Sequence, residues 1–204
     1  MLDTTFIDEL ASSAPTPGGG GASAYCGALG AAAAAMVGNL TLGKKTYADV
    51  EDEVKQHLEA LAQLQEMLIA LVDADAKAFG PLAAAYRMPK DTPEQAEAKR
   101  QAVQLALAGA AEAPITIMRT ASAVVDHADF LAHHGSRLAR SDIGTAVSLI
   151  SAAVEGASLY VFANVSAMED EELATRLRTE AEQLAATTRA RCDELFKFVK
   201  QSVS

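Results

Sequence analysis

The amino-acid sequence predicts an all-α protein, an up-and-down helical bundle with long helices. Half of its 204 residues are apolar, and these are dominated by Ala, Leu and Val, with few aromatic residues and no Trp. Apolar residues recur at intervals of three and four over several long stretches, which is the helical period. No stretch shows the alternation of a strand. We expect a single domain over residues 1–204, because this length suffices for one core.

The first predicted helix is amphipathic and spans residues 2–12, with Leu2, Phe6, Ile7 and Leu10 on one face. A loop follows, because prolines and successive glycines do not fit inside a helix. The loop residues that we expect to contact a ligand are Pro17, Gly18, Gly19, Gly20 and Gly21. Unobstructed backbone N–H groups at a helix start bind an anion or a planar polar group. The alternative is a flexible linker, although it would adjoin a buried helix directly.

Residues 22–42 form the second predicted helix, since alanine is the best helix former. Gly43 suits the left-handed position after a helix end, and Lys44 and Lys45 complement the helix dipole there. Small residues within this helix are spaced by three and four, which lets another helix of the same chain or of a second copy approach closely. These residues are Gly27, Gly30, Ala34 and Gly38.

A long amphipathic helix begins near Tyr47 and is expected to kink or break at Gly80-Pro81, because proline removes a helical hydrogen bond. A loop then leads to Thr92, which is placed to cap a new helix with Pro93 in its first position.

Within this new helix, Pro114 produces a kink or opens another segment, which ends by His134. After a turn, a helix extends to about residue 164, and an amphipathic helix over residues 170–199 ends the pattern.

The charge balance excludes some classes of partner. The chain has 17 basic and 27 acidic residues, a net charge of −10 and a pI near 4.8, which argues against nucleic acid and against an anionic membrane. Two widely separated cysteines and the lack of an N-terminal signal pattern favour a reducing, cytoplasmic setting. The nearly uncharged runs over residues 22–42 and 144–168 lack flanking aromatic belts, so we interpret them as central buried helices rather than membrane spans.

Two segments resemble motifs of other protein classes but lack residues that those motifs require. Residues 38–45 approach the phosphate-loop pattern GxxxxGK(S/T), but Lys45 replaces the hydroxyl that binds magnesium, and no strand precedes the segment. Three clustered histidines, His127, His133 and His134, lack an HExxH pattern or paired cysteines, so we expect no metal site.

Two aspartates are candidates for acid–base chemistry. Asp75 lies among alanines, and a carboxylate on an apolar face is either held by a partner or poised for proton transfer. Asp142 follows Ser141 near a helix start, where it either caps the helix or has a functional role. Asn164, near the end of an apolar helix, is either a cap or a ligand contact. We expect the glycine loop, the two lysines and these carboxylates to share a cleft.

Several short motifs occur in this chain in a fixed order. They are Pro15-Thr16-Pro17-Gly18-Gly19-Gly20, Leu40 to Tyr47 (LTLGKKTY), Asp75 to Phe79 (DAKAF), Pro89-Lys90, Ser141-Asp142, Gly156-Ala157 and Asn164. In this order the motifs resemble the cyclodeaminase/cyclohydrolase family of folate enzymes, and the likeness spans most of the chain. The fourth glycine, Gly21, is similar to the bacterial methenyltetrahydrofolate cyclohydrolase branch. Tyr160 departs from the pattern, since members usually have Asn there.

The resemblance implies hydrolysis of 5,10-methenyltetrahydrofolate to 10-formyltetrahydrofolate by a homodimer, with no metal or redox cofactor. It implies that Asp142 or Asp75 accepts a proton, while Lys44 or Lys45 holds the proton relay or the carboxylates of the folate. The further substrate contacts that it implies are the glycine loop from Pro17, Asn39, Tyr47, Lys90, Ser141 and Asn164.

Two alternatives stay open. The first is a formiminotetrahydrofolate cyclodeaminase that releases ammonia, because related groups would serve both reactions. The second is a non-catalytic folate-binding helical protein, which is favoured if Tyr160 blocks the pocket.

Overall fold

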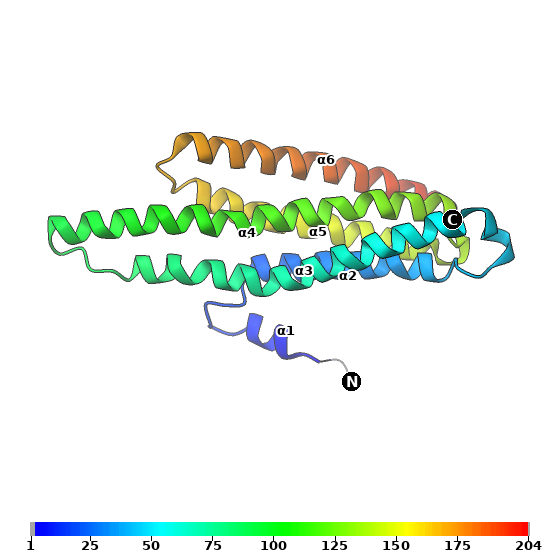
Figure 1. Cartoon of the computed structure of the whole chain (residues 1–204), viewed down its shortest axis with the longest axis horizontal. Helices are drawn as coiled ribbons and strands as arrows, with labels where there is room; N and C mark the ends of the chain where they lie inside the picture. The colour runs from blue at the N-terminus through cyan, green and yellow to red at the C-terminus, as the bar shows by residue number, and fades with distance from the viewer. Residues whose placement is uncertain (1–2, 204) are drawn as a thin grey trace.

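The computed structural model describes residues 3–203 as an all-α bundle, which confirms the predicted fold class. Its elements are α1 (Thr5–Leu10), α2 (Gly19–Asn39), the 3-10 helix η1 (Lys45–Val50), α3 (Glu51–Tyr86), α4 (Pro93–His134), the 3-10 helix η2 (Arg137–Ala139), α5 (Arg140–Val165) and α6 (Glu171–Val203). The long helices run up and down along one axis, and the α3–α4 turn extends beyond the start of α2 (Figure 1). No strand occurs within the described residues.

The central helix is α2, which packs against α3, α4 and α5, while α6 covers α4 and α5. Its small residues make these contacts possible. A Cβ at Gly30 would lie 2.8 Å from Ile150 Cδ1, and a Cβ at Gly38 would lie 2.8 Å from Leu58 Cδ2. The glycines of α2 therefore serve packing inside the chain, which is one of the two uses that the sequence left open.

Length and composition alone would let two helical segments cross a membrane, namely α2 and Arg137–Val165, with mean hydropathies of 1.3 and 1.6. In this bundle α2 and α5 pack against each other, and the buried shares of the two segments are 56% and 44%. Core helices of this composition meet the same criterion.

Neither of the two helical prolines breaks its helix. Helix α3 continues through Pro81 to Tyr86, and α4 is one helix through Pro114. A proline has no N–H for the carbonyl four residues earlier, which for Pro114 is Ala110. The Asn164 side chain of α5 supplies the missing donor, with Nδ2 3.0 Å from the Ala110 oxygen. A neighbouring helix thus replaces the bond that the proline removes.

The start of the chain also differs from its prediction. Helix α1 covers only Thr5–Leu10 and buries no residue, and its Phe6 ring lies 5.2 Å from the Tyr25 ring of α2. Leu2, which was expected on the apolar face of this helix, lies outside the described residues. The predicted cap at Thr92 is confirmed, since its Oγ1 accepts from the N–H of Gln95.

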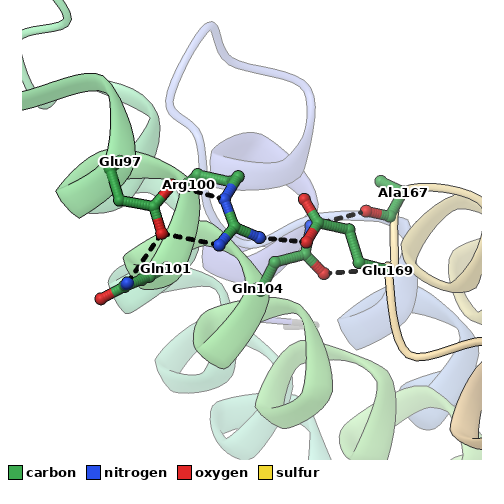
Figure 2. A network of polar contacts seen from close by, with 6 residues as sticks. All are labelled: Glu97, Arg100, Gln101, Gln104, Ala167 and Glu169. Carbon is green, nitrogen blue, oxygen red and sulfur yellow. Dashed lines mark hydrogen bonds and ion pairs between the residues drawn. The ribbon is translucent and has the colours of Figure 1, made fainter. Parts of the chain in front are cut away.

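A polar network fastens the α5–α6 connection onto α4 (Figure 2). Gln104 Nε2 donates to the Ala167 carbonyl at 3.1 Å, and the Glu169 N–H donates to Gln104 Oε1 at 2.8 Å. Arg100 pairs with both Glu97 and Glu169 and lowers the pKa of Glu97 to about 2. This network holds the last turns of α5 against α4, next to the cavity described below.

Candidate active site

A cavity of about 340 Å³ lies where the start of α2 meets the later halves of α3 and α5. Helix α3 contributes Asp75, Phe79, Leu82 and Tyr86, which are spaced by four, three and four residues and therefore share one helical face. Of these, only Asp75 is a predicted site residue. Phe79, Leu82 and Tyr86 were missed, although their helical spacing from Asp75 is the signal that could reveal them.

The remaining walls come from three other elements. Pro15, Thr16, Gly18 and Gly19 line the cavity from the start of α2, Ala110 from α4, and Tyr160, Ala163 and Asn164 from α5. Pro17 lies within this segment, and its peptide bond with Thr16 is cis. The cavity has mostly apolar walls and a few polar groups, which is typical of a site for a small organic molecule.

Asp75 is half-buried in this cavity and caps α2. Burial raises the pKa of its carboxyl group, and a hydrogen bond from the Gly21 N–H opposes that rise. The N-cap residue of α2, Gly18, has no side chain to fill this role, so the carboxylate from α3 takes the place of a local cap. No cation among residues 3–203 pairs with Asp75, so its carboxyl group is free to exchange a proton.

The first turn of α2 consists of glycines because larger side chains there would collide with residues from α3 and α5. They were predicted to form a loop, but α2 begins at Gly19. A Cβ at Gly20 would overlap the Asp75 carboxylate, and a Cβ at Gly19 would overlap the Tyr160 hydroxyl. Glycine is therefore the residue that lets both polar side chains reach the first turn of the helix. Part of the N–H cradle expected for a ligand is occupied by Asp75 itself.

Asn164 has its side-chain amide at the edge of the cavity. Its Nδ2 is used to satisfy the Ala110 carbonyl, so the group that remains for a ligand is its Oδ1.

The other predicted residues lie at the opposite end of α2, which is about 30 Å long at 1.5 Å per residue. Here Lys44 Nζ donates to Ser136 Oγ at 3.3 Å, and the Tyr47 hydroxyl accepts from the Arg137 N–H at 3.1 Å. The predicted residues at this end are Asn39, Lys44, Lys45, Tyr47, Ser141 and Asp142. The single cleft expected to hold both groups therefore does not form within one chain.

Lys90 lies apart from both groups. It is exposed in the loop between α3 and α4, four residues after Tyr86.

The histidines do not gather around a common point. His57 Nδ1 lies 2.8 Å from His127 Nδ1, while His133 Nδ1 bonds to the Asp129 carbonyl. No group of three His, Cys, Asp or Glu side chains suited to a metal ion occurs in the described part of the chain. The Cys26 thiol is half-buried and donates to the Leu149 carbonyl, and burial raises its pKa, which opposes a role as a nucleophile.

The structure is a helical bundle with a candidate site for a small organic molecule. This site brings together a carboxyl group, a phenol and an amide. The chain belongs to the formiminotransferase-cyclodeaminase family, whose pattern it matches over residues 3–183.

Known proteins agree with this assignment. The chain is 40% identical to methenyltetrahydrofolate cyclohydrolase of Methylorubrum extorquens, over 98% of this chain and 96% of that protein. It is 33% identical to formimidoyltransferase-cyclodeaminase of Gallus gallus, over 89% of this chain and 35% of that longer protein. The crystal structure of formiminotetrahydrofolate cyclodeaminase from Thermotoga maritima superposes with a TM-score of 0.88 at 28% identity, over 100% of this chain and 98% of that one.

Proposed function

We propose that the protein is a methenyltetrahydrofolate cyclohydrolase, which hydrolyses 5,10-methenyltetrahydrofolate to 10-formyltetrahydrofolate. The observation that carries the proposal is the placement of Asp75, a half-buried carboxyl group with a raised pKa inside an aromatic-walled cavity. A carboxyl group with a raised pKa is a better proton acceptor than an ordinary one, so it is suited to accept and return a proton. The near full-length similarity to a protein of this name supports the choice of reaction.

The reaction requires one proton acceptor at the right place. Water adds to the methenyl carbon, which carries positive charge, and a C–O bond forms while Asp75 accepts one proton of the water. The proton on Asp75 then passes to N5 as the C–N5 bond breaks, and the hydroxyl of the adduct gives up its proton to solvent to become the formyl carbonyl. The sum is one water consumed and one proton released, and we propose that no metal or redox cofactor takes part.

The walls of the cavity fit a flat ring system. Phe79 and Tyr86 on α3 offer aromatic faces on which a pterin ring can stack. Lys90, close to Tyr86 in sequence and exposed, is placed to attract the carboxylates of a folate tail.

We further propose a homodimer that pairs α2 with α2 of a second copy. Four large apolar side chains of α2, Tyr25, Leu29, Met36 and Leu40, are between 40% and 51% exposed. Their spacing by four, seven and four residues places them on one face, and α2 has no charged residue. If the two-fold axis of the dimer is perpendicular to α2, the two α2 helices run antiparallel, and the Lys44 end of one copy meets the Asp75 end of the other. This pairing would unite the two groups of predicted residues, and opposite charges would face each other.

Both cysteines of each chain would remain reduced in the cytoplasm, where we expect the protein to act.

The second candidate function is a formiminotetrahydrofolate cyclodeaminase, the name of the Thermotoga maritima protein with the same fold. The same carboxyl group would serve there, but the leaving group would be ammonia. Purified protein that releases ammonia from the formimino substrate and leaves methenyltetrahydrofolate untouched would select this function. Tight folate binding without either activity would instead support a binding protein.

The first test is the decay of the methenyltetrahydrofolate absorbance with purified protein, compared with buffer at the same pH. We expect acceleration by the wild type, loss of it in Asp75→Asn, and full retention in Asp73→Asn. Asp73 is the matched control, because it lies two residues away on α3 and is exposed. An Asp75→Asn variant as fast as the wild type would refute this mechanism.

A further inference from the structure

Tyr160 is a polar residue of the cavity to which the proposed reaction has so far given no role. It lies on α5 one turn before Asn164, so the two side chains line the cavity from the same helical face. Its ring reaches Gly19 so closely that a Cβ at that position would overlap the hydroxyl oxygen, with the ring carbon Cζ 2.8 Å away. The phenol is therefore held at the first turn of α2.

The Tyr160 hydroxyl and the Asp75 carboxylate line the same cavity. The hydroxyl abuts Gly19 and the carboxylate abuts Gly20, so two polar groups brought by α5 and α3 lie at consecutive residues in the first turn of α2. A ligand in the cavity is therefore within the reach of both elements of this wall.

The Tyr160 hydroxyl has no hydrogen-bond partner among residues 3–203, whereas Asp75 accepts from the Gly21 N–H. The Tyr160 side chain is 41% exposed, so its hydroxyl faces solvent when the cavity holds no ligand. The donor of Tyr160 is therefore available to a bound molecule.

We propose that Tyr160 is a second catalytic residue, which donates a hydrogen bond to the oxygen that adds to the substrate. This assignment rests on the proposed hydrolysis. As the C–N5 bond breaks, the adduct oxygen loses its proton and carries growing negative charge before it becomes the formyl carbonyl. A fixed donor beside that oxygen stabilises the charge more than it stabilises the bound substrate. Tyr160 keeps its own proton throughout, Asp75 moves one proton from water to N5, and the adduct hydroxyl gives its proton to solvent.

The direct test compares Tyr160→Phe with the wild type in the methenyltetrahydrofolate assay. We expect kcat to fall about 100-fold, the scale for loss of one such donor, with KM within about threefold. Ser166→Ala is the control, because it removes an exposed hydroxyl at the end of the same helix that bonds only to the Ala163 carbonyl, and it should retain full activity. A Tyr160→Phe enzyme with kcat within twofold of the wild type would overturn the proposal while leaving the hydrolase function intact. A wild type without activity would overturn both.

A second experiment uses Gly19. Gly19→Ala should displace the Tyr160 hydroxyl and lower kcat, but it should have no further effect in a Tyr160→Ala background, where its Cβ meets no ring. Unfolding temperatures of all four proteins establish that they fold alike. An equal loss from Gly19→Ala in both backgrounds would show that the glycine acts independently of Tyr160, and would count against the proposal.

Discussion

The contact between Asn164 and the backbone of α4 gives a prediction that separates stability from substrate binding. Pro114 leaves the Ala110 carbonyl without its helical donor, and Asn164 Nδ2 is the group that bonds to it. Ala110 is 7% exposed, so water does not readily replace the lost partner. Leaving a buried carbonyl unsatisfied costs about 1–3 kcal/mol. At about 2 kcal/mol, Asn164→Ala should lower Tm by about 4–8 °C for a chain of this size.

The assay is thermal unfolding followed by circular dichroism, for four proteins that form a double-mutant cycle. Pro114→Ala restores an N–H to α4, so Ala110 regains a donor within its own helix. In that background Asn164→Ala should be less costly by about 1–2 kcal/mol. An Asn164→Ala protein as stable as the wild type, or an equal loss of stability in both backgrounds, would refute the reasoning. A large rise in KM at unchanged Tm would instead assign the amide to the substrate.

Three further outcomes are expected. Burial raises the pKa of Asp75 in the folded state, so kcat/KM should fall as pH drops through that raised pKa. The same burial makes the charged carboxylate destabilising, so Asp75→Asn should raise Tm at pH 7 but not near pH 3, where the carboxyl group is protonated. Unchanged Tm at both pH values would contradict this. In the antiparallel dimer, Asp142 of one chain would lie at the Asp75 site of the other, so we expect Asp142→Asn to be inactive like Asp75→Asn. The two variant chains, unfolded and refolded together, should regain about a quarter of wild-type activity, since half of the dimers then hold one intact site; no recovery would argue against shared sites. Gly43 has φ +71° and no atom within 4 Å of a Cβ there, so Gly43→Ala should lower stability by about 1 kcal/mol in urea unfolding through backbone strain alone.

Much of the fold was predictable, because helical periodicity and local caps depend on nearby residues. The Thr92 cap and the left-handed Gly43 both occur as predicted. The breaks at Pro81 and Pro114 do not occur, because the decisive contacts come from other helices. Sequence spacing alone does not show that Asn164 of α5 reaches the carbonyl that Pro114 leaves free.

The candidate site was predictable only in part. Asp75 was identified because a carboxylate among alanines is unusual, and the structure places it in the cavity. The glycines before Ala22 were read as a loop, since their role depends on side chains brought from α3 and α5. The expected cleft with Lys44 and Asp142 combined residues from both ends of α2. The sequence motifs alone do not show the distance between these residues and Asp75 in the folded chain.

The packing of α2 against α5 has a consequence for synthesis. The two least polar helices of the bundle are separated by about 100 residues, so α2 leaves the ribosome long before the helix that covers it exists. At about 5–20 residues per second, the interval is about 5–20 s. During that time an uncharged helix of 21 residues has only α3 and the growing α4 to shield it. The nascent chain is therefore a client for holding chaperones, and its yield in cells should depend on them more than the stability of the finished bundle suggests.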